Sequence, residues 1–562
     1  MVRTVSIGNQ DFEKIRERNC FYVDKTRFIK EWWEQGDEVT LITRPRRFGK
    51  TLTMSMMEKF FSVEYAGREN LFEGLNIWKE EKYRKLQGTY PVIQLSFADV
   101  KENSFDQARK ALCRIIKLLY DKNDFLLKGE LLSADEKEEF RKISVDMEDH
   151  TAAFSLKILS LYLSRYHGKK VLIFLDEYDT PMQEAYVNGY WEELVSFTRS
   201  LFNATFKTNP YLERAIMTGI TRVSRESMFS DLNHLEVVTT TSEKYQDSFG
   251  FTQEEVYEAL REYGLSDRRE EVKKWYDGFV FGKHADMYNP WSIVNYLDKK
   301  KAAPYWVNTS SNSLAGKLVQ EGSPELKMTM ERLMQGEFFH TVFDEQVAYE
   351  NLKGGEGAVW SLLLASGYLR AEQTELNLDT GETEYDLKLT NMEVRIMFRQ
   401  IIRDWFGACR PVNNAFLQAM FAGDLEGMNE YMNDITSEIF SFFDTGGGFS
   451  GRAQPEKFYH GFVLGMMVEL QEKYVISSNR ESGYGRYDVM LEPREAGADA
   501  IIIEFKSVRS RRGETLESAV QGALEQIEKK QYEAQLRARG IPAERIRKYG
   551  FAFEGKEVLI GR

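Results

Sequence analysis

Cysteine is scarce in this sequence, with only 3 among 562 residues. Cys20, Cys113 and Cys409 lie far apart, and none belongs to a C-x-x-C pair. This spacing excludes a disulfide scaffold and a cysteine-rich zinc site, and it is typical of a protein from a reducing compartment.

Long apolar runs are also missing. The opening stretch MVRTVSIGNQDFEKIRERNC lacks the hydrophobic segment of a signal peptide. Runs such as VLIFL at residues 171–175 are far shorter than the roughly 20 residues that a membrane helix needs. We therefore expect a soluble, cytoplasmic protein with no membrane partner.

The chain has no excess of basic residues, since 75 Lys and Arg face 88 Asp and Glu to give a net charge of −13. This balance favours solubility and argues against nucleic-acid binding over the whole surface. Local basic tracts, VRSRRGE at 508–514 and RARGIPAERIRK at 537–548, can still follow a phosphate backbone, although solvated helix faces explain them equally well.

The chain has ample apolar material, 42% hydrophobic and 13% aromatic residues, which is enough for several packed cores. Over the first 240 residues, short β-branched runs alternate with stretches of helical periodicity, such as residues 104–123. The expected strands are residues 38–43, 90–97, 169–179, 213–221 and 234–241. This alternation predicts an α/β fold with a mostly parallel sheet and helices on both faces.

The remaining sequence changes character twice. From residue 251 it reads as mainly helical, with turn residues in WYDGFVFG and a short strand pair at 366–373 and 384–390. The glycine-rich stretch DTGGGFSGRAQPEK at 444–457 is the best candidate linker. Beyond it we expect an apolar helix, a strand pair, a charged helix over 514–538 and a closing strand.

RPRRFGKT at residues 44–51 follows an expected strand, precedes an expected helix and ends like a phosphate-binding loop, G-x-x-x-x-G-K-[ST]. Gly49 would let the backbone approach a phosphate, Lys50 would neutralise its charge, and the Thr51 hydroxyl would bind Mg²⁺. Arg44 stands where the first glycine is usual, so a basic strand-to-helix turn is the alternative. The candidate nucleotide-binding residues are Arg44, Pro45, Arg46, Arg47, Phe48, Gly49, Lys50, Thr51 and Thr218.

The run VLIFLDEYD has the form of a second nucleotide-site strand, apolar and ending in acids. Asp176 would bind Mg²⁺, and Glu177 would polarise the attacking water. In the next strand, Thr218 is placed to sense a γ-phosphate, and Arg222 and Arg225 follow as candidates to stabilise negative charge in the transition state. An ordinary strand exit and solvated arginines are the alternatives. Together the two motifs indicate a nucleoside triphosphate with magnesium.

Several rare strings occur in order: FYVDKT, RPRRFGKT, LDEYD, TGITRVSRESMFSDLN, WYDGF and YNPWS. Through them, residues 6–296 resemble a prokaryotic family of AAA-ATPase-like proteins, which commonly carry a C-terminal PD-(D/E)XK nuclease-superfamily domain. The resemblance implies a P-loop NTPase sheet of AAA/STAND-like type and ATP as the nucleotide. It also implies that an arginine-rich loop is the family's normal form, so that Arg44 is no sign of decay.

A second set of charged residues lies in RYDVMLEP and IIIEFKSV. Alternate residues of a strand share a face, so Glu504 and Lys506 project together, and Asp488 comes from the neighbouring strand. Asp488 and Glu504 would bind Mg²⁺, and Lys506 would orient or deprotonate water. This D…E-x-K pattern is the PD-(D/E)XK signature; an edge-strand charge pair is the alternative.

Two accessory features of such nucleases are less clear in this sequence. Glu469 is a candidate for an additional acid, although a place on a helix surface explains it as well. Gln526 and Tyr532 are six residues apart, whereas the superfamily often places a glutamine and a tyrosine one helical turn apart.

These motifs predict four regions: a P-loop ATPase core at 1–250, its helical extension at 251–310, a mainly helical middle region at 311–446, and a small α/β nuclease-like domain at 447–562. The predicted function is an ATPase coupled to a Mg²⁺-dependent nuclease that acts on DNA or RNA. One alternative is an ATP-dependent switch whose C-terminal domain binds nucleic acid or protein without cleavage, and another is a binding module with an inactive ATPase. An arginine supplied by a second copy would require a homo-oligomer.

Overall fold

The computed structural model divides the chain into two compact units. The first comprises Met1–Ser311 and Phe338–Arg395, and the second comprises Asn312–Glu337 and Ile396–Arg562. The described residues are 2–221, 229, 232–307, 313–342, 356–379, 381–405, 410–444, 465–466, 469–478, 481–482, 485–486, 488–508, 514–554 and 557–562. The four predicted regions stay a prediction.

The first unit is built on a parallel five-stranded sheet with the order β2-β3-β4-β1-β5. Its strands are β1 (Val39–Thr43), β2 (Val92–Ser96), β3 (Val171–Asp176), β4 (Leu212–Gly219) and β5 (Leu235–Val238). Four lie within the segments expected from the sequence and β4 begins one residue before its segment, which confirms the predicted parallel sheet. Because β4 lies between β1 and β3, the carboxyl ends of these three strands meet at one edge.

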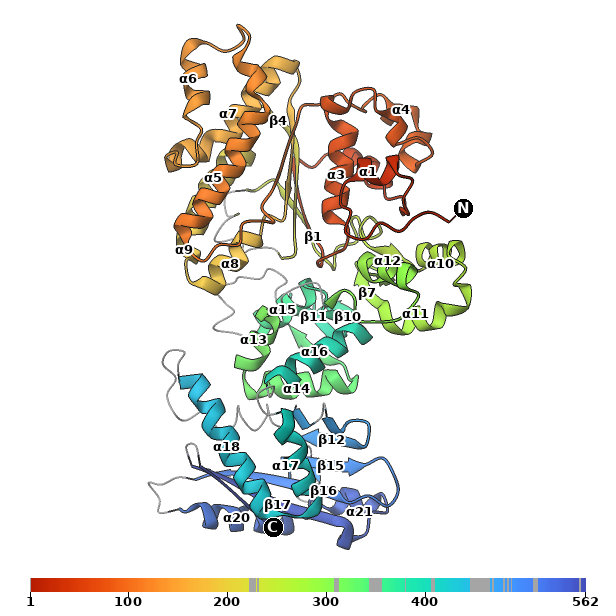
Figure 1. Ribbon diagram of the computed structural model, residues 1–562, viewed down its shortest axis with the longest axis vertical. Helices are drawn as coiled ribbons and strands as arrows, with labels where there is room; N and C mark the ends of the chain where they lie inside the picture. The colour runs from red at the N-terminus through yellow and green to blue at the C-terminus, as the bar shows by residue number, and fades with distance from the viewer. Residues whose placement is uncertain are drawn as a thin grey trace. The chain divides into compact units, whose positions relative to one another are not determined.

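Helices cover both faces of this sheet, as predicted (Figure 1). One face carries α5 (Phe105–Lys122), α7 (Asp149–His167) and α9 (Trp191–Phe202), and the other carries α1 (Phe12–Glu17) and α3 (Lys50–Phe61). The remaining helices of this part are α2 (Arg27–Gln35), α4 (Glu81–Arg84), α6 (Ala134–Lys142) and α8 (Thr180–Asn188). The core beside α3 is aromatic and includes the fully buried Trp32, Phe60 and Phe174.

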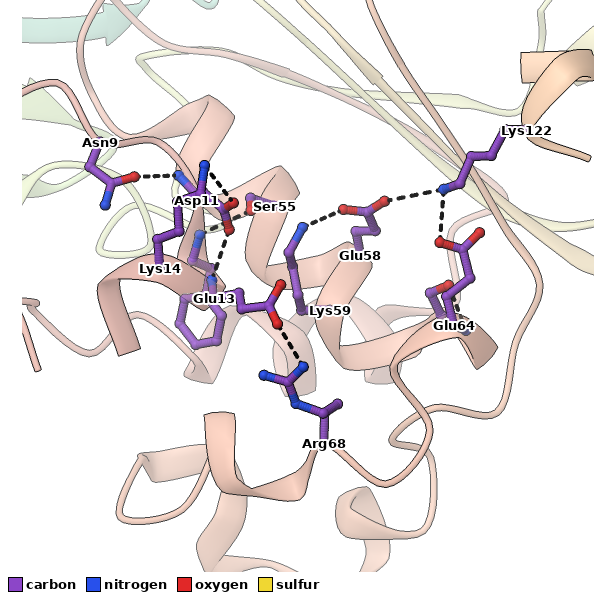
Figure 2. Close-up of polar contacts among 12 residues, drawn as sticks. Asn9, Asp11, Glu13, Lys14, Ser55, Glu58, Lys59, Glu64, Arg68 and Lys122 are labelled. Atoms are coloured by element: carbon purple, nitrogen blue, oxygen red, sulfur yellow. Dashed lines mark hydrogen bonds and ion pairs between the residues drawn. The ribbon is translucent and has the colours of Figure 1, made fainter. Parts of the chain in front are cut away.

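Polar contacts fix α1 against α3 at the base of the phosphate loop (Figure 2). Asp11 caps α1 by accepting a hydrogen bond from the Glu13 amide at 3.0 Å, and the Phe12 amide donates to the Ser55 hydroxyl of α3 at 3.1 Å. Further along α3, Lys59 pairs with its neighbour Glu58 at 2.7 Å. The helix that starts at Lys50 is therefore held on its outer side as well as against the sheet.

A second, antiparallel sheet in the first unit has the order β6-β8-β7, formed by β6 (Phe251–Thr252), β7 (Asp277–Phe281) and β8 (His284–Tyr288). Helices α10 (Gln253–Glu262), α11 (Arg269–Tyr276) and α12 (Pro290–Lys299) surround it. The expectation of a turn at WYDGFVFG was wrong, because this segment ends α11 and then forms β7. Gly278 has φ +124°, and a Cβ there would lie 2.1 Å from the carbonyl of Thr390. Close backbone packing therefore requires this glycine.

The middle of the chain is mainly helical, with a three-stranded sheet of order β10-β11-β9. Strands β10 (Leu369–Leu376) and β11 (Thr383–Leu389) confirm the expected pair, and β9 (Phe339–Val342) is an addition, too short to stand out in the sequence. The helices are α13 (Ser313–Glu321), α14 (Pro324–Gln335), α15 (Glu356–Ala365), α16 (Met392–Trp405), α17 (Arg410–Ala422) and α18 (Leu425–Asp444).

The second unit contains a five-stranded mixed sheet of order β12-β15-β16-β17-β18. Its elements are β12 (Tyr474–Ser478), β15 (Val489–Pro493), β16 (Ala500–Ser507), α20 (Leu516–Lys529), α21 (Ala534–Ala538), β17 (Ile546–Glu554) and β18 (Glu557–Gly561), with the short strands β13 (Glu481–Ser482) and β14 (Gly485–Arg486). The charged helix predicted over 514–538 is interrupted at Gln531, whose φ is +54°. The expected closing strand is a hairpin, and most of the apolar helix expected at 458–474 lies outside the described residues.

Two asparagines of α18 cover the edge of this sheet. Asn429 accepts a hydrogen bond from the Ile560 amide at 2.7 Å and donates to its carbonyl at 3.0 Å. Asn433, one turn later, does the same with the amide and carbonyl of Val558 at 2.9 and 2.8 Å. The carboxamides thus take the place of a neighbouring strand beside β18.

Candidate functional site

The phosphate loop curls into the first turn of α3. Arg47 and Gly49 both have left-handed backbones, with φ of +65° and +85°, and Gly49 is the N-cap of a helix that starts at Lys50. The first amides of a helix have no partner within the helix, and such a turn directs consecutive N–H groups inward. The local geometry therefore suits an anion at the start of α3.

Lys50 lies across this loop. Its side chain is buried, and the ammonium group donates to the carbonyls of Arg44 and Pro45 at 2.8 and 2.9 Å. Burial lowers the pKa of Lys50, and the nearby carboxylates of Glu177 and Asp176 oppose that shift. The cation and the acids therefore lie close together, at the carboxyl edge of the parallel sheet.

Asp176 ends β3 with only 3% of its surface exposed. Its carboxyl group accepts hydrogen bonds from the hydroxyl groups of Thr218 and Thr51. Burial raises the pKa of Asp176, and these two hydroxyl groups lower it. The two predicted Mg²⁺ ligands, Thr51 and Asp176, are thus in contact, and carboxylate and hydroxyl oxygens are the donors that Mg²⁺ prefers.

Glu177 is held in a left-handed conformation with φ +51°. Its backbone amide donates to the Thr218 hydroxyl at 3.4 Å, and its carboxylate accepts from Thr180 at 3.2 Å. A non-glycine residue with positive φ is strained, and strain of this kind is frequent at functional sites. Because of this turn, Asp176 and Glu177 have different partners. Asp176 contacts Thr51 and Thr218, and Glu177 contacts Thr180.

The expected role of Arg44 in adding charge to the nucleotide site requires correction. Its side chain is fully buried and donates to the carbonyls of Thr43, Thr239 and Tyr245 at 2.9, 2.6 and 3.4 Å. The guanidinium also lies 4.7 Å from the ring centroid of Phe281. Even the backbone amide is engaged, with the carbonyl of Gly219 at 3.1 Å. Arg44 therefore joins the loop to the end of β5.

Pro45 and Phe48 also serve packing. Phe48 is buried, with ring centroids 4.8 and 5.2 Å from those of Phe279 and Phe281 on β7. Pro45 has no N–H to donate and lies so close to Gly367 that a Cβ there would come within 2.8 Å of it. The side chains of Pro45 and Phe48 are therefore occupied by packing. Of these two residues, Phe48 alone has a backbone N–H that it could offer to an anion.

The other two loop arginines have accessible side chains. Arg47 is exposed and stacks over Trp291 at 4.4 Å, and Arg46 donates to the Gln183 carboxamide at 3.1 Å. The predicted Arg222 and Arg225 lie outside the described residues. The structure therefore brings together Lys50, Thr51, Asp176, Glu177 and Thr218, with Gly49 at the helix start.

The second predicted site lies on β16 in the second unit. Glu504 is 2% exposed, and its carboxylate is 3.7 Å from the ammonium group of Lys506. Asp488 immediately precedes β15, and its carboxylate accepts from the Phe505 amide at 2.7 Å. The strand pairing of β15 with β16 thus places Asp488, Glu504 and Lys506 together, as the sequence predicted.

The surroundings of Glu504 favour the protonated form of its carboxyl group. Burial, followed by the charge of Asp488, raises the pKa of Glu504 to about 8, and Lys506 opposes that shift. The Oε2 atom of Glu504 is buried and makes no hydrogen bond. An unsatisfied buried oxygen beside a second carboxylate fits a divalent cation. In the described part of the chain no three acidic, histidine or cysteine side chains converge on one point, so such an ion would complete its shell with water or phosphate oxygens.

Comparison with known proteins agrees with this geometry. Residues 6–229 match the model of a predicted AAA-ATPase family, and residues 454–562 match a PD-(D/E)XK nuclease-superfamily model. The chain joins an AAA-ATPase-like domain to a PD-(D/E)XK nuclease-superfamily domain. It is also 24% identical over 550 residues to an uncharacterized protein in the vnfD 5′ region of Azotobacter chroococcum mcd 1, covering 96% of this chain and 95% of that protein.

Within the PD-(D/E)XK domain, sequence reasoning missed the place of Gln526. Its carboxamide accepts from Lys506, donates to Glu504 and lies 3.1 Å from the hydroxyl group of Tyr532. The six-residue separation is bridged because α20 ends before Tyr532, so the two residues do not follow one helix. Glu469 is ion-paired with Arg403 at 3.4 Å, in keeping with a helix-surface role.

The FYVDKT string connects segments away from the AAA-ATPase-like site. In FYVDKT, Asp24 accepts from the amides of Thr26 and Asn76 at 2.9 and 2.7 Å, and Lys25 pairs with Glu255 at 2.7 Å.

No helix among the described residues combines the length and apolar character needed to span a bilayer.

Proposed function

We propose that the chain binds and hydrolyses ATP at the loop of Lys50, and that this controls a Mg²⁺-dependent nuclease at Asp488, Glu504 and Lys506. The observation that carries the first half is the contact of Thr51 with Asp176, beside buried Lys50 at the start of α3. The carboxylate pair with an unsatisfied oxygen on Glu504 supports the second half.

In the proposed ATPase, Lys50 and the first amides of α3 bind the phosphates. Thr51 and Asp176 hold Mg²⁺, which offsets negative charge on the phosphates. Thr218 fixes the Asp176 carboxylate by its hydrogen bond, and Glu177 orients the attacking water and accepts its proton. Arg222 and Arg225 are proposed to stabilise the charge that develops.

In the proposed nuclease, Asp488 and Glu504 hold Mg²⁺, which offsets charge on the scissile phosphodiester. Lys506 orients the water that attacks the phosphorus. Gln526 holds Glu504 and Lys506 in register, because its carboxamide accepts from one and donates to the other. The expected partner is nucleic acid.

Two substitutions separate the activities. Lys50→Ala should reduce ATP hydrolysis by at least about 100-fold, whereas Glu504→Ala should abolish cleavage of nucleic acid and leave the ATPase unchanged. Lys122→Ala on α5 and Glu528→Ala on α20 serve as matched controls, since their side chains are 48% and 65% exposed. Hydrolysis is measured as phosphate release, and cleavage is measured on DNA and RNA, single- and double-stranded, with Mg²⁺.

Equal phosphate release by Lys50→Ala and the unaltered protein would exclude the assigned ATP site. Cleavage by Glu504→Ala at the unaltered rate would exclude the assigned nuclease site. If the unaltered protein hydrolyses ATP but cleaves no nucleic acid with Mg²⁺ or Mn²⁺, the switch without cleavage is the better description.

A further inference from the structure

A chain of hydrogen bonds joins the phosphate loop to the end of β4. Arg46 donates to the Gln183 carbonyl oxygen at 3.1 Å, and the Gln183 amide donates to the Asp179 carboxylate at 3.3 Å. The same carboxylate oxygen accepts from the backbone amides of Ile220 and Thr221 at 2.9 and 3.0 Å. Gln183, on α8, therefore joins Arg46 of the loop to Asp179, whose carboxylate holds this turn.

A glutamine suits this position better than any charged residue. Its carboxamide has one acceptor end and one donor end, and here they face a guanidinium and a carboxylate. Only one orientation of the amide satisfies both neighbours, so the positions of Arg46 and Asp179 are correlated through Gln183.

The Asp179 carboxylate is held in place by hydrogen bonds from the turn after β4. It is 1% exposed, and the Thr221 hydroxyl group donates to it at 3.2 Å in addition to the two amides. The turn is tightly packed, because a Cβ at Gly219 would lie 2.6 Å from the Tyr178 ring and 2.9 Å from Asp179. A small displacement of Asp179 must therefore move residues 219–221.

Arg46 is the residue of this hydrogen-bonded series that can exchange its partner. It is only partly buried, and it makes no ion pair with a carboxylate in the described part of the chain. Its bond to Gln183 has one charged partner, whereas a guanidinium–phosphate contact has two and is frequently bidentate. When phosphate is bound at the loop, Arg46 gains by exchanging the neutral amide of Gln183 for a phosphate oxygen.

We propose that Gln183 is a positioning residue that transmits occupation of the phosphate loop to the turn at Ile220 and Thr221. The inference rests on the proposed ATP site. Release of Arg46 frees the acceptor end of Gln183, and the turn held by Asp179 relaxes. The series therefore adjusts the backbone at Ile220 and Thr221 to the state of the loop.

Hydrogen exchange at the amides of Ile220 and Thr221 tests this coupling without relying on catalysis. A non-hydrolysable ATP analogue with Mg²⁺ should change their exchange rates by about fivefold or more, the lower end of typical coupling energies. In Gln183→Leu the analogue should still raise the melting temperature, but the change in exchange should be lost, and kcat should fall with little change in KM. Asn188→Ala, on the same helix and with a side chain that donates to the Glu184 carbonyl of that helix, should respond as the unaltered protein does.

Gln183→Glu provides an opposite test. Its carboxylate would pair with Arg46 and repel Asp179, so affinity for the analogue should fall by about tenfold and exchange at 220–221 should rise without nucleotide. An unaltered response of the turn in Gln183→Leu would overturn the coupling alone. Failure of the analogue to bind the unaltered protein would overturn the proposed ATP site, and the coupling with it.

Discussion

Glu393 is a fully buried carboxyl group that accepts hydrogen bonds from neutral donors. It accepts from the Ser292 hydroxyl at 2.7 Å and from the Trp306 amide at 3.1 Å, and burial raises its pKa to about 7. The folded protein keeps this proton up to about pH 7, whereas the unfolded chain loses it near 4.5. Glu393 therefore lowers the free energy of unfolding as pH rises through this window.

Glu393→Gln should remove that dependence. Between pH 4.5 and 8 the unaltered protein should lose on the order of 3 kcal/mol that the variant retains. Urea unfolding of both proteins at pH 5 and pH 8 measures the difference. Parallel losses of stability in the two proteins would show that Glu393 is not the titrating group.

Glu504 must lose a proton before it binds a cation. Because its pKa is raised to about 8, Mg²⁺ affinity should increase by about tenfold per pH unit below that value and level off above it. Calorimetric titration with Mg²⁺ at pH 6, 7 and 8.5 gives this profile. An affinity that does not change over this range would contradict the role of Glu504 as a ligand.

The residues that sequence alone identified are those whose chemistry is tied to a motif. Lys50, Asp176 and Glu504 stand at fixed places in short patterns, and the structure brings their predicted partners to them. The role of Arg44 could not be predicted in this way, because its charge suggested phosphate while its side chain is buried against the carbonyls of Thr239 and Tyr245, which follow β5. Gln183 belongs to no motif, and its proposed role depends on Arg46, which is distant in the sequence, as well as on nearby Asp179.

The contact between α18 and β18 gives a prediction for one structural element. Replacing both Asn429 and Asn433 with alanine removes four hydrogen bonds and exposes a strand edge. At about 0.5–1.5 kcal/mol per bond, the loss of stability should be about 2–6 kcal/mol, with a greater tendency to aggregate.

Aspartate at both positions separates the two halves of this interaction. Its carboxylate still accepts from the backbone amides of β18 but cannot donate to the carbonyls. Thermal unfolding and light scattering should place this variant between the unaltered protein and the double alanine variant. Equal stability of all three proteins would show that β18 does not depend on α18.

Helices and strands could be predicted where the residue pattern alone determines the local structure. The β-branched runs of β1, β3 and β16 are buried on both faces, and this gives them an unmistakable pattern. β7 was missed because its glycine suggests a turn, while tertiary packing against Thr390 makes that glycine necessary. The Asn429 and Asn433 contacts were invisible, since asparagine on a helix carries no signal of a strand edge.

The two proposed sites belong to different compact units of the whole molecule. Lys50 lies in the first unit and Glu504 in the second. The described side chains of each site come from one unit alone, so the two activities should be separable by mutation even though they are proposed to be coupled. The order of motifs along the chain suggested this organisation, but the exchange of chain between the units near residues 311–338 and 395 has no signature in the sequence.

Binding of Mg²⁺–ATP tests the central claim most directly. With ATP at a hundredfold excess over its dissociation constant, the free energy of unfolding of the unaltered protein should rise by about 2.7 kcal/mol. The increase should vanish in Lys50→Ala and when Mg²⁺ is removed by a chelator. Unfolding of the unaltered protein that is the same with and without Mg²⁺–ATP would contradict the account.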